Sequence, residues 1–134
     1  MTKSEKSAAR QLTLSWLAET ANYLINECGW ERRRAFRHTH QVLILMQSLG
    51  RGTVHFTYRK KNGEKRKAVG TLCQGISEVL DAYFEQHTDV AEMTAPQKTV
   101  SYWDLQRGGW RSLLIDRFVS IDKVELKTDD EDAE

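Results

Sequence analysis

The side chains of this chain that are best suited to chemistry are basic and aromatic ones. Residues 30–70 contain eleven Lys or Arg and only two Glu, whereas residues 78–92 contain five acids and no base. Cations that bind phosphates and flat rings that stack on bases are what a nucleic-acid groove requires. The 134 residues sum to a net charge of only +1, so the polarity is local and favours an anionic partner at close range.

We predict from these residue types a binding surface for nucleic acid or a nucleotide-like ligand. Its candidate members are Arg59, Lys61, Lys65, Arg66, Lys67, Tyr102, Trp103 and Arg111. A secondary basic face is expected from Arg33, Arg34 and Arg37, which together with His38 fall opposite the apolar side of a helix at about 100° per residue. The alternative interpretation is that these charges only solvate the surface and that the strand aromatics fill the core.

Catalytic and metal-binding patterns are not evident. His38 and His40 are two residues apart, which on a helix places them about 200° apart and prevents them from sharing a metal. Cys28 and Cys73 have no neighbouring Cys or His at ligand spacing, and two cysteines cannot frame a disulfide scaffold. Because the chain also lacks a phosphate-binding glycine loop and a nucleophile elbow, we expect no cofactor, no metal and no enzymatic activity.

Two helices are expected to come first. From Ser4 to Cys28 the apolar positions Leu14, Leu17, Ala21, Leu24 and Cys28 recur at steps of three and four, and Trp16 and Ile25 widen this stripe. Gly29 predicts the end of that helix. From Trp30 to Leu49 the buried stripe is expected at Ala35, Thr39, Val42, Met46 and Leu49. The longest uninterrupted apolar run, residues 42–46, is far shorter than the roughly 18 residues of a membrane span.

Five strands are expected to follow. Val54, Phe56 and Tyr58 alternate with polar residues, so Tyr58 is expected to share the buried face of Val54 and Phe56. Asn62-Gly63 predicts a hairpin in which both residues have positive φ. The return strand is expected over 65–72. A second hairpin pairs 99–105 with 110–115, which makes Trp103 and Trp110 a candidate cross-strand pair. The last strand is expected over 118–126, and this number of short strands is typical of a small curled barrel.

The domain boundaries follow from these elements. We expect a helical segment over 1–50, a barrel over 51–126 with an acidic insert at about 74–98, and a disordered acidic tail over 127–134. The insert is expected to hold a short acidic helix at 76–84 and a loop over 88–98. No basic and then apolar leader opens the sequence, so a cytoplasmic location without membrane association is expected.

The region 52–126 resembles the WYL-type domains of bacteria, in their small stand-alone Sm-like/SH3-like barrel variety. The resemblance rests on VHFTYRKKNG at 54–63, RKAVGTL at 66–72, VSYWDL at 100–105 and WRSLLIDRF at 110–118. The last run is the most specific, since residues 111–118 are similar to the family's Arg-x-Phe-x-x-Asp-Arg-Ile ending. The name-giving tripeptide falls at Tyr102 and Trp103, in the order Tyr-Trp-Asp.

The resemblance implies an α+β protein in which two N-terminal helices pack on a five-stranded SH3-like barrel. It implies binding of nucleic acid or nucleotide-like ligands, in transcription or phage-defence regulation. Matched position by position, it adds Asp116 and Arg117 to the candidate site beside Arg66 and Arg111, although Asp116 and Arg117 are equally suited to pair with each other or to cap a turn. The alternative functions are a protein–protein adaptor or homo-oligomer built by pairing of strand edges, and a small-molecule sensor.

Overall fold

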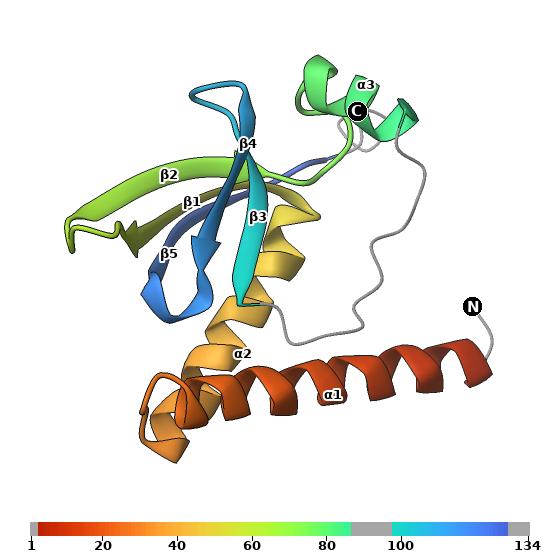
Figure 1. Cartoon of the computed structure of the whole chain (residues 1–134). Helices are drawn as coiled ribbons and strands as arrows, with labels where there is room; N and C mark the ends of the chain where they lie inside the picture. Colours follow the sequence, from red (N-terminus) through yellow and green to blue (C-terminus); the bar gives the residue numbers. More distant parts are fainter. Residues whose placement is uncertain (1–2, 87–97, 129–134) are drawn as a thin grey trace.

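The computed structural model describes residues 3–86 and 98–128 and confirms the predicted α+β class. Two helices are followed by two β-hairpins separated by a short helix, and by a fifth strand (Figure 1). The elements are α1 (Lys3–Asn26), α2 (Arg32–Leu49), β1 (Gly52–Arg59), β2 (Lys65–Thr71), α3 (Glu78–Gln86), β3 (Thr99–Asp104), β4 (Gly109–Leu114), the 3₁₀ turn η1 (Ile115–Arg117) and β5 (Phe118–Leu126). Most of the loop expected over 88–98 and of the tail expected over 127–134 lies outside the described residues.

The five strands form one antiparallel sheet in the order β4-β3-β2-β1-β5. β2 is the middle strand, and β1 pairs with β2 on one side and with the edge strand β5 on the other. The β1–β5 register shifts at two places, between His55 and Phe56 and between Thr57 and Tyr58, and such irregularities bend and twist a strand pair. The sheet therefore curls like a small barrel, but within the described strands β4 and β5 remain its two open edges.

Both predicted hairpins are confirmed, but the conformation expected for the first turn is wrong. Gly63 has φ of 86°, whereas no described residue other than glycine has positive φ, so Asn62 does not adopt the left-handed conformation. The Lys60 amide donates to the Glu64 carbonyl, which closes a longer loop than a two-residue turn. The Asn62 side-chain oxygen instead accepts from the Glu64 amide at 3.0 Å.

The two N-terminal helices form a hairpin on which the sheet rests. In Figure 1, α2 rises into the hollow of the curled sheet and α1 lies across its lower end. One continuous core joins Leu24 of α1, Leu45 and Leu49 of α2, and Val54 and Phe56 of β1. Burial of such side chains is the main source of stability in a chain of this size.

The apolar stripe expected on α1 is partly wrong. Leu14 is 58% exposed, whereas Trp16, Thr20 and Leu24, spaced four residues apart, are buried. α1 packs against α2, and the weak amphipathicity of α1 does not reveal which of its sides is covered. On α2, Met46 was expected to be buried but is half-buried, whereas its neighbour Leu45 is fully buried.

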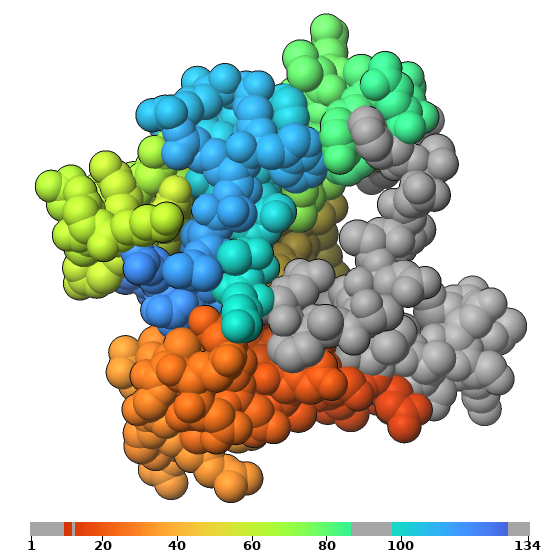
Figure 2. Space-filling view, viewed as in Figure 1, coloured from red at the N-terminus to blue at the C-terminus, as the bar shows by residue number. Residues whose placement is uncertain are grey.

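The predicted acidic helix of the insert is confirmed as α3, two residues later than expected. Its start is fixed by side-chain hydrogen bonds: the Ser77 hydroxyl accepts from the Leu80 amide at 3.3 Å, and the Asp81 carboxylate accepts from the Gly75 amide at 3.0 Å. Leu80 is fully buried, whereas Val79 and Tyr83 are exposed. Figure 2 shows α3 in green against the blue β3–β4 hairpin, so this helix lies beside that hairpin.

The close contact between β1 and β5 predicts the effect of a single methyl group. A Cβ on Gly52 would collide with the backbone carbonyl of Glu125 and lie 2.9 Å from the Leu126 Cα. Because these are backbone atoms, we expect Gly52→Ala to lower the free energy of unfolding by about 1–3 kcal/mol in urea titrations. Gly109→Ala is the control, because nothing lies within 4 Å of its added Cβ, and a change within about 0.5 kcal/mol is expected. Equal effects of the two substitutions would contradict the packing argument.

Candidate functional site

A buried carboxylate organises the charged residues of the sheet. Asp104, the last residue of β3, is fully buried. Its Oδ2 accepts a hydrogen bond from Arg66 Nη2 and forms an ion pair with Arg111 Nε, each at 3.1 Å. Its Oδ1 accepts from the amides of Gln106 at 2.9 Å and Arg107 at 3.1 Å. Four donors on one anion offset the cost of removing it from water, and the carboxylate joins β2, β3 and β4.

Strand register explains why these three residues meet. Arg66 lies on the face of β2 that also carries Ala68 and Gly70, and Asp104 is paired with Gly70. Arg111 is paired with Tyr102 and therefore lies on the same face of the β3–β4 hairpin as Asp104. The side chains of Arg66 and Arg111 are only 17% and 25% exposed, so the structure gives both predicted cations an internal partner.

Asp104 was missed by the sequence analysis. An available signal was its place at the end of a strand, directly before a glycine-containing turn, where a carboxylate can accept from the turn amides. Its pairing with two arginines has no such local signal, since Arg66 lies 38 positions earlier in the chain.

The aromatic residues at the family tripeptide belong to the core. Tyr102 is fully buried, its hydroxyl lies 3.2 Å from that of Tyr58, and burial together with this hydrogen bond raises its pKa. Trp103 is 6% exposed and meets Trp110 edge to face at 5.5 Å, which confirms the predicted cross-strand pair. Tyr58 is buried as predicted. Neither Tyr102 nor Trp103 offers a ring face to solvent, whereas Trp110 is 40% exposed.

A second group of predicted cations lines a small cavity, which we call the basic pocket. Its volume is about 110 Å³, and its lining comes from the β1–β2 hairpin on one side and from β4 and η1 on the other. The lining residues are Tyr58, Arg59, Lys60, Lys61, Ser112, Leu113, Leu114 and Arg117. Arg59, Lys61 and Arg117 were predicted site residues, and Lys60 was not. Basic residues from segments more than fifty positions apart in the chain therefore line one cavity. Two of them also have partners in the hairpin loop: Lys60 Nζ lies 3.9 Å from Glu64, and Arg59 donates to the Gly63 carbonyl at 3.0 Å.

The remaining predicted cations lie elsewhere. Lys65 and Lys67 are exposed on the opposite face of β2 from Arg66, where Lys67 is paired with Thr57. Thr57 donates to Asp122 at 2.6 Å and Ser120 donates to it at 2.7 Å, and these hydrogen bonds, with a smaller contribution from Lys67, lower the pKa of Asp122.

The arginines of the secondary face are exposed on the first turns of α2. Arg34 lies over the ring of Trp30 with its guanidinium carbon 3.9 Å from the ring centroid. The Glu31 carboxylate caps α2 by accepting from the amides of Arg34 and Arg33, which lowers the pKa of Glu31. Neither these two arginines nor Arg37 lines the basic pocket.

His38 is not on the exposed face where the helix geometry placed it. It is half-buried between Trp30 and Phe118, with ring centroids 4.6 Å and 5.9 Å away, and its Nε2 donates to the Ile115 carbonyl at 2.7 Å. The reason is that β5 and η1 cover this side of α2, which no pattern within the helix reveals. His38 therefore attaches α2 to the turn that carries Arg117.

Asp116 and Arg117 do not form an ion pair with each other among the described residues. Asp116 Oδ1 is instead buried without a hydrogen-bond partner. Burial lowers the pKa of His38 and raises that of Tyr23, and Asp116 adds a small upward contribution to the pKa of both groups, so Asp116 lies where the helical hairpin meets the barrel. We therefore place Asp116 in this junction and Arg117 in the basic pocket.

The family model described as "WYL_2, Sm-like SH3 beta-barrel fold" matches residues 42–119, more than half of the chain. The chain belongs to the WYL_2 family. The WYL_2 region begins within α2 and ends at the start of β5, so it contains the Asp104 ion pairs and the basic pocket but neither α1 nor the arginines of the secondary face. Searches among curated proteins and among solved structures gave no match.

Metal-binding clusters, membrane-spanning helices and free thiols were considered within the parts of this WYL_2 chain that the structure describes. Residues 3–86 and 98–128 contain no cluster of three or more His, Cys, Asp or Glu placed to hold a metal ion. None of the described helices combines the length and hydropathy that crossing a bilayer takes. Cys28 and Cys73 are both half-buried free thiols.

The buried position of Asp104 predicts a large effect of removing its charge. Asp104→Asn leaves Arg66 and Arg111 without their anion, and we expect a loss of about 2–5 kcal/mol in the free energy of unfolding, measured by urea titration. Glu125→Gln is the matched control, because Glu125 is exposed and pairs with Lys123 at 3.0 Å on the surface, where little change is expected. A similar loss in both variants would show that burial of the ion pairs is not what matters.

The environment of His38 predicts a pH dependence. Burial lowers its pKa below the ordinary 6.5, with Arg34 acting in the same direction and the Ile115 carbonyl and Asp116 opposing it. The unfolded chain therefore takes up the proton first, so stability falls as the pH drops below about 6.5. We expect the loss of stability between about pH 7.5 and about pH 5.5 to be smaller in His38→Gln than in the wild type. His40→Gln, an exposed histidine on the same helix, should keep the wild-type pH dependence.

Proposed function

We propose that this chain is a non-enzymatic binding module for nucleic acid or a nucleotide-like ligand, and that the basic pocket holds a phosphate. The observation that carries the proposal is the convergence of Arg59, Lys60, Lys61 and Arg117 on one cavity. No acidic side chain belongs to the lining that the described residues form there. Guanidinium and ammonium groups are the side chains that bind phosphate, and arginine binds it in a bidentate manner.

The Asp104 ion pairs support this site from within. Arg66 belongs to β2, which leads out of the β1–β2 hairpin, and Arg111 belongs to β4, which forms the opposite wall of the basic pocket. Because both arginines are bound to one carboxylate, the two walls are held at a fixed separation. In this proposal Arg66 and Arg111 are positioning residues, and the phosphate is bound by the cations of the hairpin and of η1.

The biological setting belongs to the same proposal. We place the chain in the cytoplasm, as a component of regulation or of a mobile genetic element, without a cofactor and without a catalytic step. This setting follows from the kind of ligand and from the WYL resemblance. The proposed class of ligand includes DNA, RNA and free nucleotides.

Self-association is a second candidate function, supported by the two open edges of the sheet. β4 and β5 each pair with one strand only among the described residues. β5 also exposes Val119, Val124 and Leu126, the last of them 62% exposed. An exposed strand edge that carries apolar side chains is suited to pairing with a second copy or with another protein.

Salt-dependent binding tests the proposal. We expect fluorescence anisotropy with labelled DNA and RNA to show affinity that falls steeply between about 50 and about 200 mM salt. Lys61→Gln and Arg117→Gln should each weaken binding and reduce the salt slope by about one. Arg10→Gln on α1, an exposed cation far along the chain from the pocket, is the control and should leave the slope unchanged.

The outcomes separate the two candidate functions. Absence of binding to every nucleic acid at low salt would contradict the proposal. A molecular mass that rises with protein concentration in light scattering, together with such an absence, would support self-association. Arg117→Lys is a useful further variant because it keeps the charge while removing the bidentate geometry.

A further inference from the structure

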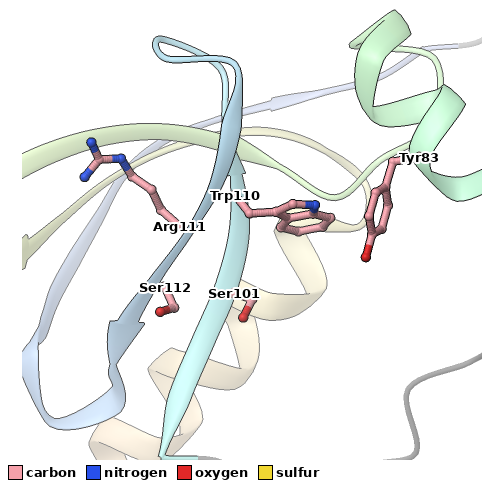
Figure 3. A pocket seen from close by; sticks show the side chains of 5 residues that line it. All are labelled: Tyr83, Ser101, Trp110, Arg111 and Ser112. Atoms are coloured by element: carbon pink, nitrogen blue, oxygen red, sulfur yellow. The ribbon is translucent and has the colours of Figure 1, made fainter. Parts of the chain in front are cut away.

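A second cavity lies on the other side of β4 from the basic pocket, beside α3. It has a volume of about 380 Å³ and is lined by Tyr83, Ser101, Trp110, Arg111 and Ser112 (Figure 3). We call it the aromatic pocket. Trp110 is 40% and Tyr83 36% exposed, so both rings are accessible. Tyr83 comes from α3 in the acidic insert, and the other four residues come from β3 and β4.

The ring of Trp110 is held in place by its neighbours. Its centroid lies 5.5 Å from that of Trp103 and 5.2 Å from that of Tyr83, with interplanar angles of 89° and 67°. Contacts on two sides restrict the rotamers of Trp110 before any ligand arrives, which lowers the entropic cost of binding. A tryptophan that is both fixed and exposed is suited to stacking on a flat ligand.

Two hydroxyl groups lie next to this ring. Ser101 and Ser112 are directly paired in the β3–β4 register, one position of the same face away from Trp103 and Trp110. Figure 3 shows the two serines side by side on the strands, with Trp110 directed toward Tyr83 and Arg111 directed away from both rings. The aromatic pocket therefore offers a stacking surface at one end and neutral hydrogen-bonding groups in the middle.

Ser112 is the residue that connects the two cavities. It lines the aromatic pocket and it also lines the basic pocket. Ser112 therefore lies between the ring of Trp110 in one pocket and the basic residues of the other, which include Lys60, Lys61 and Arg117. A ligand that contacts Ser112 can extend toward an aromatic ring in one direction and toward cations in the other.

We propose that the two pockets form one site for an unpaired nucleotide. Its base stacks on Trp110 beside Tyr83, its sugar lies at the hydroxyls of Ser101 and Ser112, and its phosphate lies in the basic pocket. This inference rests on the proposed function and deepens it, because it specifies a base whose face is open. Bases in a duplex have both faces covered by their neighbours, whereas single strands and free nucleotides share the required chemistry.

Removal of the ring tests the stacking contact. The probe is a labelled single strand of about 12 nucleotides, as DNA and as RNA, with the same strand annealed to its complement for comparison. We expect Trp110→Leu to weaken single-strand binding by roughly five- to 100-fold without changing the salt slope. Trp110→Phe should keep most of the affinity. Phe36→Leu on α2 removes another exposed ring and should leave the affinity unchanged.

Trp110 also contacts the buried Trp103, so a substitution of Trp110 can disturb the fold as well as the site. A second variant separates these two effects. Ser112 is exposed, so Ser112→Glu places an acid at the junction of the pockets without opening the core. We expect this variant to keep the wild-type melting temperature and to lose single-strand binding. Competition with adenosine monophosphate identifies the source of the ligand: displacement of the strand points to a free nucleotide, and its absence points to a polymer.

The outcomes distinguish this inference from the proposed function. If Lys61→Gln and Ser112→Glu weaken binding while Trp110→Leu does not, the basic pocket binds phosphate alone and the nucleotide site is wrong, because Ser112 lines the basic pocket as well. Equal affinity for duplex and single strand in the wild type would also overturn the nucleotide site. If the wild type binds no nucleic acid or nucleotide at low salt, both proposals fail together.

Discussion

The carboxylate of Asp104 is fully buried, and a buried anion is stable only when donors surround it. Here the donors are two arginines from neighbouring strands and two amides of the following turn, so one anion fixes β2, β3, β4 and the β3–β4 turn relative to one another. Most of the walls of both pockets belong to these strands or to the hairpins that they form, and α3 adds Tyr83 and η1 adds Arg117. The geometry of the candidate site therefore depends on an ion cluster that itself lies mostly away from solvent.

The second constraint is that the sheet curls without closing. Register shifts bend β1 against β5, while β2 and β3 are paired only at Gly70–Asp104 and Thr71–Trp103. Because β4 is an edge strand, its residues are free of a further strand on one side, and Ser112 can line a cavity toward the β1–β2 hairpin as well as one toward α3. A barrel closed by a β4–β5 ladder would leave less space at this position.

The helical hairpin completes the arrangement by holding η1. His38 donates to the Ile115 carbonyl from α2, and its ring lies between Trp30 and Phe118. Arg117, two residues after Ile115, is thereby held where it lines the basic pocket. Trp30 and His38 precede residue 42, where the family match begins, so the segment outside the WYL_2 region helps to position a cation inside it.

The sequence by itself determined the order of helices and strands, the two hairpins, the acidic helix and the family, because these follow from local periodicity, turn residues and motif strings. It also predicted that Tyr58 is buried, from the alternation along its strand, and that Trp103 and Trp110 are a cross-strand pair, from the position of the hairpin turn. Only the tertiary structure decided which charges meet. Asp104 binds Arg66 across 38 positions, His38 turns inward because β5 covers α2, and the predicted cations divide among three surfaces. Such partners are chosen by register between distant strands and by the packing of whole elements, and no local spacing encodes either.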